Sequence, residues 1–258
     1  MVKLQIGTAC YDGLVTVGYM MSMVKLMNFF RENGVAMNTI VSTKRSMVTR
    51  ARNSLISRFL YTSDATHFMF IDADISFEPT LVHRMLAFDE DVVGGMYARK
   101  ELRWDASEAI RQNEPPKTAG LQYTGLLCEG DEHQRRGPFV TARYCGAGFM
   151  MVKRHVVERL VEAHPESACR SENFQYNSSV TNQESFRNHA LFDCMIDPET
   201  REYLGDDLAF CHRWRALGGR IWIDVEGSLV HVGQHRYVGG RPAEQLEIGE
   251  TPLAVTPR

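Results

Sequence analysis

The sequence lacks the features that mark secreted, membrane-spanning or nucleic-acid-binding proteins. Its apolar runs are short and interrupted by polar residues, so none is long enough to span a bilayer. The first residues, MVKLQIGTACYDG, do not show the pattern of a signal peptide. The 29 basic and 32 acidic residues give a formal net charge of −3, without a basic tail or block. This charge does not favour binding to nucleic acid through phosphate contacts.

Cysteine pairs at metal-binding or disulfide spacing are also lacking. A chain of 258 residues is long enough to bury a core without disulfides. There is no CxxC pair among the six cysteines, which are Cys10, Cys128, Cys145, Cys169, Cys194 and Cys211. We therefore expect reduced, mostly buried thiols in a cytoplasmic protein.

What the sequence does contain is an alternation of strand-like and helix-like segments. Strands are predicted at 3–8, 35–41, 67–71 and 91–95, and helices at 15–32, 46–61 and from Pro79 onward. The run HFMFI is apolar throughout, which is typical of a strand covered on both faces. This alternation predicts an α/β fold with a doubly wound, mostly parallel sheet and flanking helices.

The predicted helix over 15–32 has apolar residues at helical spacing on one side. They are Val17, Met20, Met21, Val24, Met27 and Phe30. This spacing is typical of an amphipathic helix.

The second half predicts further elements of the same domain. Strands are expected at 140–144, 220–224 and 228–232, and helices at 153–163 and 206–217. Two polar segments, 101–138 and 164–190, interrupt this alternation of strands and helices and are predicted to be long functional loops. One domain is predicted over 1–240, followed by a tail over 241–258, and the segment from Gly239 onward is rich in Pro, Gly and Glu.

Asp72-Ala73-Asp74 is the main candidate site, because it follows the buried strand directly. Ligands of open α/β sheets bind outside the carboxyl ends of the strands. In extended backbone, side chains two residues apart point the same way. We therefore predict that Asp72 and Asp74 together bind Mg²⁺ or Mn²⁺ and, through the cation, a diphosphate. The simpler alternative is an acidic turn that ends the strand.

Two acids, Asp206 and Asp207, open the predicted helix over 206–217. Asp207 lies on one helical stripe with Phe210 and Trp214, so it should point toward the core or a cleft. An aspartate in the first turn also stabilises a helix by capping and through the helix dipole. That structural role accounts for one of the two acids, and we predict that both are catalytic.

His231 ends an apolar strand pattern and is the candidate third metal ligand. Imidazole binds borderline metals, although a histidine in this position is often only structural. His235 is close in sequence and competes for the same role.

Nucleotide binding is predicted for the first βα loop, the second helix and nearby residues. The loop TACYDG offers backbone N–H groups and a tyrosine ring, while no Walker A or GxGxxG motif is present. We expect Arg50 and Asn53 to share the helix face opposite the core, and Lys100 to contact the diphosphate. An ordinary turn and a solvated helix face are the alternatives. The full set of candidates is Thr8, Ala9, Tyr11, Asp12, Arg50, Asn53, Asp72, Ala73 and Lys100.

The motifs occur in a definite order along the chain. They are TACYDG, RARN, FIDADISF, GAGFMMVKR, YLGDDLAFCHRW, GGRIWID and LVHVG. From about Lys3 to Gly240 this set resembles the GT-A-type glycosyltransferases, nearest to an Anp1/Mnn9-like group and its bacterial and viral relatives. The resemblance implies a metal-dependent hexosyltransferase. Such an enzyme moves a sugar from a UDP- or GDP-sugar to a glycan or another hydroxyl acceptor.

The resemblance also implies roles for individual residues. Asp72 and Asp74 would bind Mn²⁺ or Mg²⁺ and the donor, with His231 as the distal metal ligand. Asp207 would accept the acceptor's proton if the reaction inverts the anomeric centre, and would orient the acceptor if it retains configuration. Asp206 stands where the family has a glutamate. Thr8, Tyr11, Asp12 and Asn53 would lie near the nucleotide, and Gly146-Ala147-Gly148 would close on the sugar or acceptor.

Three other functions remain open from the sequence. A haloacid-dehalogenase-like phosphohydrolase would use Asp72 as nucleophile and Asp74 as acid and base, but Ile75-Ser76-Phe77 lacks that family's usual glycine. A sugar-nucleotide pyrophosphorylase would need a basic early loop, which TACYDG is not. A non-catalytic carbohydrate-binding protein would not need the acidic pair. We expect no nucleic acid partner, and a lipid-linked acceptor would require peripheral contact with a membrane.

Overall fold

The computed structural model describes residues 2–43, 47–102, 118, 120–170, 187–233 and 236–238. The helices of these ranges are α1 Val17–Glu32, α2 Val48–Thr62, α3 Pro79–Phe88, α5 Arg154–Ala163 and α6 Asp206–Ala216. The strands of the central sheet are β1 Lys3–Cys10, β2 Ala36–Thr43, β3 His67–Ile71, β5 Val92–Gly95, β8 Leu126–Leu127, β9 Arg135–Arg136, β10 Phe139–Tyr144, β11 Phe149–Lys153 and β16 Ile221–Asp224.

Shorter elements surround this sheet. They are β4 Ile75–Ser76, β6 Ala98–Leu102, β7 Leu121–Tyr123, η1 Gly130–Glu132, η2 Pro165–Ser167, β12 Ala168–Arg170, β13 Arg187–His189, β14 Met195–Ile196, β15 Tyr203–Leu204, β17 Val230–Val232 and β18 Arg236–Val238. The predicted tail over 241–258 and the domain boundary at 240 lie outside the described residues.

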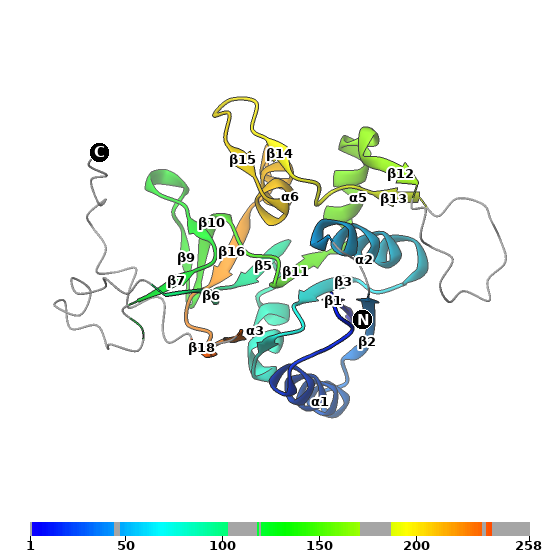
Figure 1. The fold of residues 1–258 in the computed structure, drawn as a ribbon, viewed down its shortest axis with the longest axis vertical. Helices are drawn as coiled ribbons and strands as arrows, with labels where there is room; N and C mark the ends of the chain where they lie inside the picture. Colours follow the sequence, from blue (N-terminus) through cyan, green and yellow to red (C-terminus); the bar gives the residue numbers. More distant parts are fainter. Residues whose placement is uncertain are drawn as a thin grey trace.

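The central sheet has the strand order β2-β1-β3-β11-β5-β16-β10-β8, with β9 paired to β10 (Figure 1). Strands β2, β1, β3, β5 and β16 point the same way, while β11 and β10 run against them. The predicted α/β class, with a mixed but mostly parallel sheet and flanking helices, is therefore confirmed.

Strand β11 was not predicted, although it lies in the middle of the sheet between β3 and β5. Its sequence, FMMVK, is a short apolar run directly before a helix. Periodicity alone does not separate such a run from the start of a buried helix. Pairing with β3 and β5 on both sides decides that it is a strand.

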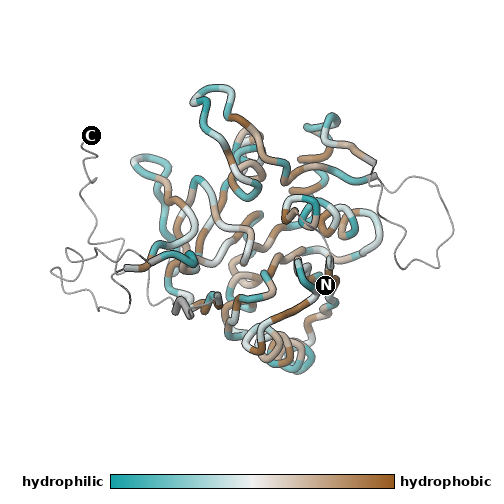
Figure 2. Tube along the Cα trace, in the orientation of Figure 1, coloured by the Kyte–Doolittle hydropathy of each residue, from teal (hydrophilic) through white to brown (hydrophobic). Residues whose placement is uncertain are grey.

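The core lies on both faces of the sheet. Along β3, Phe68 and Phe70 pack with α2, α5 and α6, whereas Met69 and Ile71 pack with α1 and α3. This division follows from the alternation of side chains along a strand. In Figure 2 the hydrophobic segments accordingly run through the central strands, and hydrophilic segments lie in the outer loops.

The apolar residues at helical spacing in α1 are exposed, except Phe30, which is buried. The buried residues of this helix include Tyr19, Met23 and Leu26, whereas Val17 is 73% and Met27 is 56% exposed. Because α1 is apolar on both sides, its spacing alone does not say which side faces the sheet. Tyr19 fixes the rotation, since its hydroxyl lies 2.6 Å from the hydroxyl of the buried Thr8 on β1.

The strand predicted at 228–232 also differs from its expected place. It forms β17, which leaves the central sheet and pairs with β4 and β18 instead. In this small sheet His231 lies opposite Ile75, directly after the acidic turn. The pairing therefore carries a residue from the end of the chain to the carboxyl end of β3.

All six cysteines are free thiols, and four of them are buried. Cys169 and Cys194 are exposed. Among the described residues, no helix is both long and apolar enough to cross a membrane.

Candidate functional site

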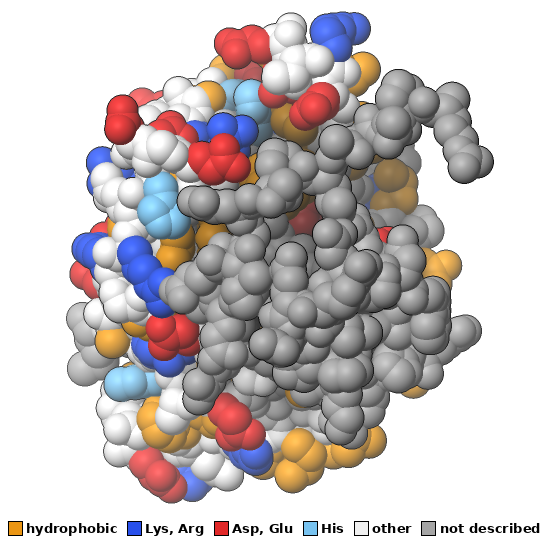
Figure 3. All heavy atoms as spheres, turned by 90° about the vertical axis from the view of Figure 1, so that its left-hand side faces the viewer, with side chains coloured by type: hydrophobic (Ala, Val, Ile, Leu, Met, Phe, Trp, Pro, Cys, Tyr) orange, Lys and Arg blue, Asp and Glu red, His pale blue; other side chains and the backbone are white. Residues whose placement is uncertain are grey.

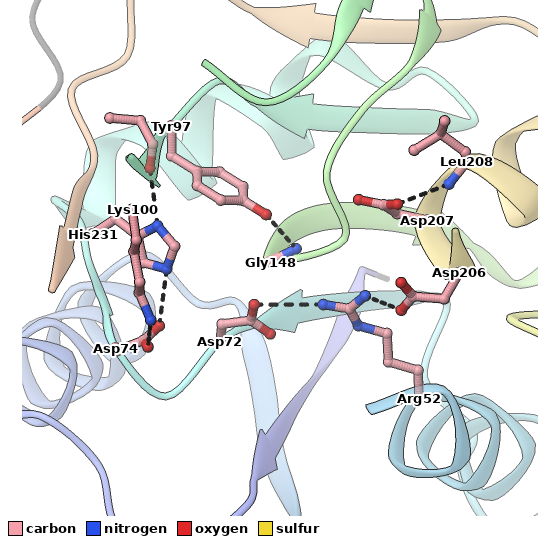
Figure 4. A network of polar contacts seen from close by, with 11 residues as sticks. Arg52, Asp72, Asp74, Tyr97, Lys100, Gly148, Asp206, Asp207, Leu208 and His231 are labelled. Carbon is pink, nitrogen blue, oxygen red and sulfur yellow. Dashed lines mark hydrogen bonds and ion pairs between the residues drawn. The ribbon is translucent and has the colours of Figure 1, made fainter. Parts of the chain in front are cut away.

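The acidic segment Asp72-Ala73-Asp74 forms a turn and does not continue the extended strand. The N–H of Ile75 donates to the Asp72 carbonyl at 3.1 Å, and the N–H of Asp72 donates to the Gly148 carbonyl at 2.9 Å. The expectation of extended geometry is therefore wrong. As a result, the two carboxylates point to different partners, Asp72 toward Arg52 and Asp74 toward Lys100 and His231 (Figure 4).

Asp74 joins a basic pair at the end of the small β4–β17 sheet. The Nε2 atom of His231 lies 3.3 Å from Asp74 Oδ1, and Lys100 Nζ forms an ion pair with Asp74 Oδ2. The Nδ1–H of His231 donates to the Ala98 carbonyl at 2.9 Å, which turns Nε2 toward Asp74. Burial alone raises the pKa of Asp74, but hydrogen bonds and charge from His231 and Lys100 outweigh it and lower the pKa. Asp74 is therefore ionised at neutral pH.

A divalent cation would fit here only if the substrate supplied some of its ligands. No three His, Cys, Asp or Glu residues within the described ranges form a metal-binding cluster. Asp74 and His231 nevertheless present one carboxylate and one imidazole to the same place. Mg²⁺ commonly keeps one or two protein carboxylates plus phosphate oxygens and water, and imidazole favours a softer ion such as Mn²⁺ over Mg²⁺. The donor set therefore suits a cation that a diphosphate completes.

Arg52 connects the acidic turn to α6, although it is not among the site residues predicted from the sequence. Its side chain is 8% exposed, and its guanidinium lies 3.4 Å from Asp72 Oδ2 through Nη2 and forms an ion pair with Asp206 through Nη1. Burial alone lowers the pKa of Arg52, but the charges of Asp72 and Asp206 raise it above its ordinary value. The sequence did carry a signal for this residue. Arg52 precedes the buried Leu55, Ile56 and Phe59 by three, four and seven residues, which places it on the same side of α2.

Asp207 lies beside this bridge but outside it. Its Oδ1 atom accepts the N–H of Leu208 at 2.9 Å, and it forms no ion pair within the part of the chain that the structure describes. Burial and the charge of Asp206 raise the pKa of Asp207, and Arg52 offsets this only in part. A carboxylate with a raised pKa is suited to accept a proton from substrate. The inward stripe expected of α6 is confirmed, since Phe210 and Trp214 are buried.

The segment Gly146-Ala147-Gly148 packs closely against Tyr97 and Asp72. The hydroxyl of the buried Tyr97 accepts the N–H of Gly148 at 3.0 Å. A Cβ atom on Gly148 would lie 2.5 Å from Tyr97 Oη and 2.7 Å from Asp72 Oδ2, and one on Gly146 would lie 2.6 Å from Tyr97 Oη. Glycine therefore allows this loop to approach the Asp72 carboxylate.

Replacing Gly148 with alanine is expected to lower the free energy of unfolding by about 1–3 kcal/mol, because the new methyl group displaces Tyr97 or Asp72. Urea denaturation measures this change. The control is Gly205→Ala, where the nearest atom to a Cβ is Asp207 Oδ1 at 3.8 Å, an ordinary contact. Equal stability of the two variants would contradict the close packing described here.

A cleft of about 490 Å³ opens beside the acidic turn. This volume is in the range of small-molecule sites. Thr16 joins its two sides, because its N–H and hydroxyl both donate to the Ala73 carbonyl, at 2.9 and 3.3 Å. The residues that line the cleft are Ala9, Tyr11, Asp12, Leu14, Val15, Thr16, Val48, Asp72, Ala73, Asp74, Lys100 and His231.

Most of the predicted nucleotide and metal residues therefore share this cleft, but three do not line it. Thr8 is buried against Tyr19 behind the cleft, and Arg50 is exposed on α2. Asn53 is buried, donates to Asp193 Oδ1 at 2.7 Å and accepts the N–H of Phe192 at 2.8 Å. The prediction that Arg50 and Asn53 share the side of α2 opposite the core is therefore wrong. His235 lies outside the described residues.

No protein-family model and no curated protein sequence matches this chain. Three solved structures match parts of this chain: A197 from STIV, a putative glucose-1-phosphate thymidylyltransferase from Bacillus anthracis, and a glycosyltransferase involved in glycosylation of the major capsid of PBCV-1. A197 is 14% identical with a TM-score of 0.47, and the match covers 90% of this chain and 86% of A197.

The other two structures are more distant. The thymidylyltransferase is 11% identical with a TM-score of 0.33, covering 62% of this chain and 75% of that protein. The capsid glycosyltransferase is 9% identical with a TM-score of 0.28, covering 64% and 68%. Such likeness carries no argument about activity, which depends on the residues of the site. The Anp1/Mnn9-like grouping stays a prediction.

Proposed function

We propose that this protein is a metal-dependent glycosyltransferase that uses a nucleoside-diphosphate sugar and a hydroxyl acceptor. The observation that carries the proposal is the meeting of Asp74, His231 and Lys100 at one wall of a cleft whose other wall is the first βα loop. A carboxylate and an imidazole suit a divalent cation, and an ammonium suits a phosphate oxygen. Together they match the chemistry of a diphosphate bound with its metal.

The donor half of the reaction follows from these residues. Asp74 and His231 would hold Mn²⁺ or Mg²⁺, and the cation would neutralise the charge that develops on the departing diphosphate. Lys100, now paired with Asp74, would donate to a phosphate oxygen. Tyr11 is exposed at the cleft and offers its ring to the base, while Asp12 offers acceptor oxygens to ribose hydroxyls.

The acceptor half is assigned to the start of α6. Asp206 is held by Arg52, which leaves Asp207 as the carboxylate that can receive a proton. In an inverting reaction Asp207 would accept the proton of the attacking hydroxyl, and in a retaining reaction it would orient the acceptor. Arg52 contacts Asp72 as well as Asp206, so it positions these two carboxylates.

If the reaction inverts the anomeric centre, the rate of transfer is expected to fall as pH decreases through the pKa of Asp207. Burial raises that pKa above the ordinary value of 3.8, and protonation below it removes the base. The acid limb of kcat/KM should therefore lie above the ordinary carboxylate range, and Asp207→Asn should lose at least about 100-fold in kcat. A profile measured with saturating metal tests this. An Asp207→Asn enzyme with the wild-type rate and profile would exclude Asp207 as the base.

A thermal-shift screen with UDP, GDP and CDP, each with and without Mn²⁺, tests the proposed function itself. A ligand that binds only the folded state at 100 times its Kd stabilises the protein by about 2.7 kcal/mol. We expect one nucleotide to raise the melting temperature only when Mn²⁺ is present. No shift with any nucleotide and metal would contradict the proposal.

The phosphohydrolase alternative is not favoured by the position of Asp72. That mechanism needs the Asp72 carboxylate to attack phosphorus, but one of its oxygens faces the buried Arg52 at 3.4 Å. Covalent phosphorylation of Asp72 would support the alternative. Slow hydrolysis of a nucleotide sugar without acceptor would support the transferase.

A further inference from the structure

Tyr97 is a buried residue that contacts two separate parts of the candidate site. In Figure 4 its ring lies between His231 and Gly148. His231 faces Asp74, and the Gly148 carbonyl accepts the N–H of Asp72. The whole residue is only 5% exposed. A single side chain therefore connects the surroundings of the two carboxylates of the acidic turn.

Buried contacts of this kind constrain geometry more than charges at the surface do. On the face drawn in Figure 3, Lys and Arg side chains lie beside Asp and Glu side chains over the described surface. Exposed opposite charges contribute little, because water and salt screen them. The polar contact of Tyr97 is shielded from water, so it holds its partner more firmly.

The backbone of Tyr97 is fixed by Thr124. The N–H of Thr124 donates to the Tyr97 carbonyl at 2.9 Å, and the Thr124 hydroxyl donates to the same carbonyl at 3.2 Å. The N–H of Tyr97 lies 3.4 Å from Thr124 Oγ1. These bonds set the direction of the Tyr97 side chain without any ligand.

The ring of Tyr97 holds the imidazole of His231. Their ring centroids are 5.2 Å apart and their planes meet at 87°, which is an edge-to-face contact. The next residue, Ala98, accepts the Nδ1–H of His231 through its carbonyl at 2.9 Å. His231 is therefore held both on its ring and at Nδ1, which leaves Nε2 to face Asp74 and a cation.

The hydroxyl of Tyr97 holds the loop that contains Gly148. It accepts the N–H of Gly148 at 3.0 Å, and the Gly148 carbonyl in turn accepts the N–H of Asp72 at 2.9 Å. These two hydrogen bonds form a chain from the phenol to the start of the acidic turn. The hydroxyl therefore positions the Gly148 backbone beside Asp72.

The place of Gly148 matters for transfer. In Figure 4, Gly148 and Asp72 lie between Asp74 and Asp207. In the proposed reaction the sugar leaves a diphosphate held at Asp74 and joins an acceptor held at Asp207. The transferred sugar must therefore pass Gly148.

We propose that Tyr97 is a positioning residue, whose ring sets His231 for the cation and whose hydroxyl sets Gly148 for the transferred sugar. This role rests on the proposed glycosyltransferase function. Because the ring and the hydroxyl act on different partners, two substitutions separate their effects.

Tyr97→Leu tests the ring. Leucine keeps an apolar side chain in the core but lacks the aromatic contact with His231. The test measures the Mn²⁺ concentration that gives half the maximal rise in melting temperature, with the one of UDP, GDP and CDP that stabilises the wild type. That concentration should increase about two- to tenfold, the worth of one aromatic pair. Tyr97→Phe, which keeps the ring, should restore the wild-type value.

Tyr97→Phe tests the hydroxyl. The N–H of Gly148 loses its acceptor, while the contact with His231 remains. We expect kcat to fall at least about tenfold while KM for the nucleotide sugar changes less than about threefold, because the donor stays bound but the loop beside the sugar is misplaced.

The matched control is Tyr19, a second buried tyrosine, whose hydroxyl lies 2.6 Å from Thr8 Oγ1 behind the cleft. Tyr19→Leu and Tyr19→Phe should lower the melting temperature as the Tyr97 variants do, yet leave kcat and the Mn²⁺ requirement unchanged. Equal losses in the two pairs would show that Tyr97 is only structural and would overturn the inference. So would a wild-type Mn²⁺ requirement in Tyr97→Leu or a wild-type kcat in Tyr97→Phe. If Tyr97→Leu does not fold, kcat of Tyr97→Phe decides.

The wild-type protein separates the two proposals. If no nucleotide gives it a Mn²⁺-dependent shift, the proposed function fails and the positioning role fails with it. If the wild type shows the shift and transfers sugar, and both Tyr97 variants match it, only the positioning role fails.

Discussion

The Asp74→Asn variant is expected to lose the Mn²⁺-dependent rise in melting temperature that a nucleoside diphosphate gives the wild-type protein. Asp74 is the shared partner of His231 Nε2 and Lys100 Nζ, and its pKa is lowered by both. Asparagine keeps the shape of the side chain but removes the negative charge that a divalent cation requires. We therefore expect Asp74→Asn to impair ligand binding more than it lowers the stability of the unliganded protein.

The size of this effect can be stated. Saturating ligand at about 100 Kd contributes about 2.7 kcal/mol, which corresponds to roughly 5–10 °C for a chain of this length. We expect that rise in the wild type and less than about 1 °C in Asp74→Asn. The transfer rate should fall at least about 100-fold, as when one group that stabilises transition-state charge is removed.

A matched control is available at the opposite end of β3. Asp64 precedes that strand, is exposed and forms an ion pair with Lys3, much as Asp74 does with Lys100. Asp64→Asn should keep both the nucleotide shift and the rate. If Asp74→Asn behaves in the same way as this control, Asp74 does not hold the metal.

Replacing Arg52 with methionine is expected to have the largest effect on stability. It leaves Asp72 and Asp206 without the guanidinium that lies between them. Removing one partner of a buried ion pair typically costs about 3–5 kcal/mol, because the remaining charge is uncompensated. The melting temperature should fall by about 6–20 °C. Thermal and urea unfolding at neutral pH measure the change.

A second substitution at this position separates stability from positioning. Arg52→Lys keeps a positive charge but cannot bridge two carboxylates with a planar fork. We expect most of the stability to return while kcat stays at least about tenfold below wild type. Removing the charges of the partners, with Asp72→Asn and Asp206→Asn added to Arg52→Met, should also recover stability.

The control for Arg52 is Arg84, which pairs with the fully buried Asp224 through Nη2 at 2.6 Å. Arg84→Met should also destabilise the protein. It should nevertheless leave unchanged the rise in melting temperature that the nucleotide and Mn²⁺ cause. An Arg52→Met protein as stable as wild type would show that the bridge does not hold the acidic turn to α6.

Local spacing predicted much of the fold because helices and strands have different periods. The strand at 67–71 and the helices beginning near Val48 and Pro79 are found within two residues of their expected bounds. The position of the acidic turn follows from the same signal, since the apolar run ends at Ile71.

Three features of the site could not be predicted from local spacing. The direction of Asp72 and Asp74 depends on a turn that the Asp72 carbonyl closes, which breaks the alternation of an extended strand. The bridge from Arg52 to Asp206 spans 154 residues of chain. His231 reaches Asp74 only because β17 pairs with β4.

The amino-acid sequence by itself determined the helices, most of the longer strands and the position of the acidic turn, because these depend on neighbours within a few residues. Only the tertiary structure decided which side of α1 faces the core, where β11 inserts, and which charges meet across the cleft. Those outcomes depend on the register between distant segments, and no local period encodes that register.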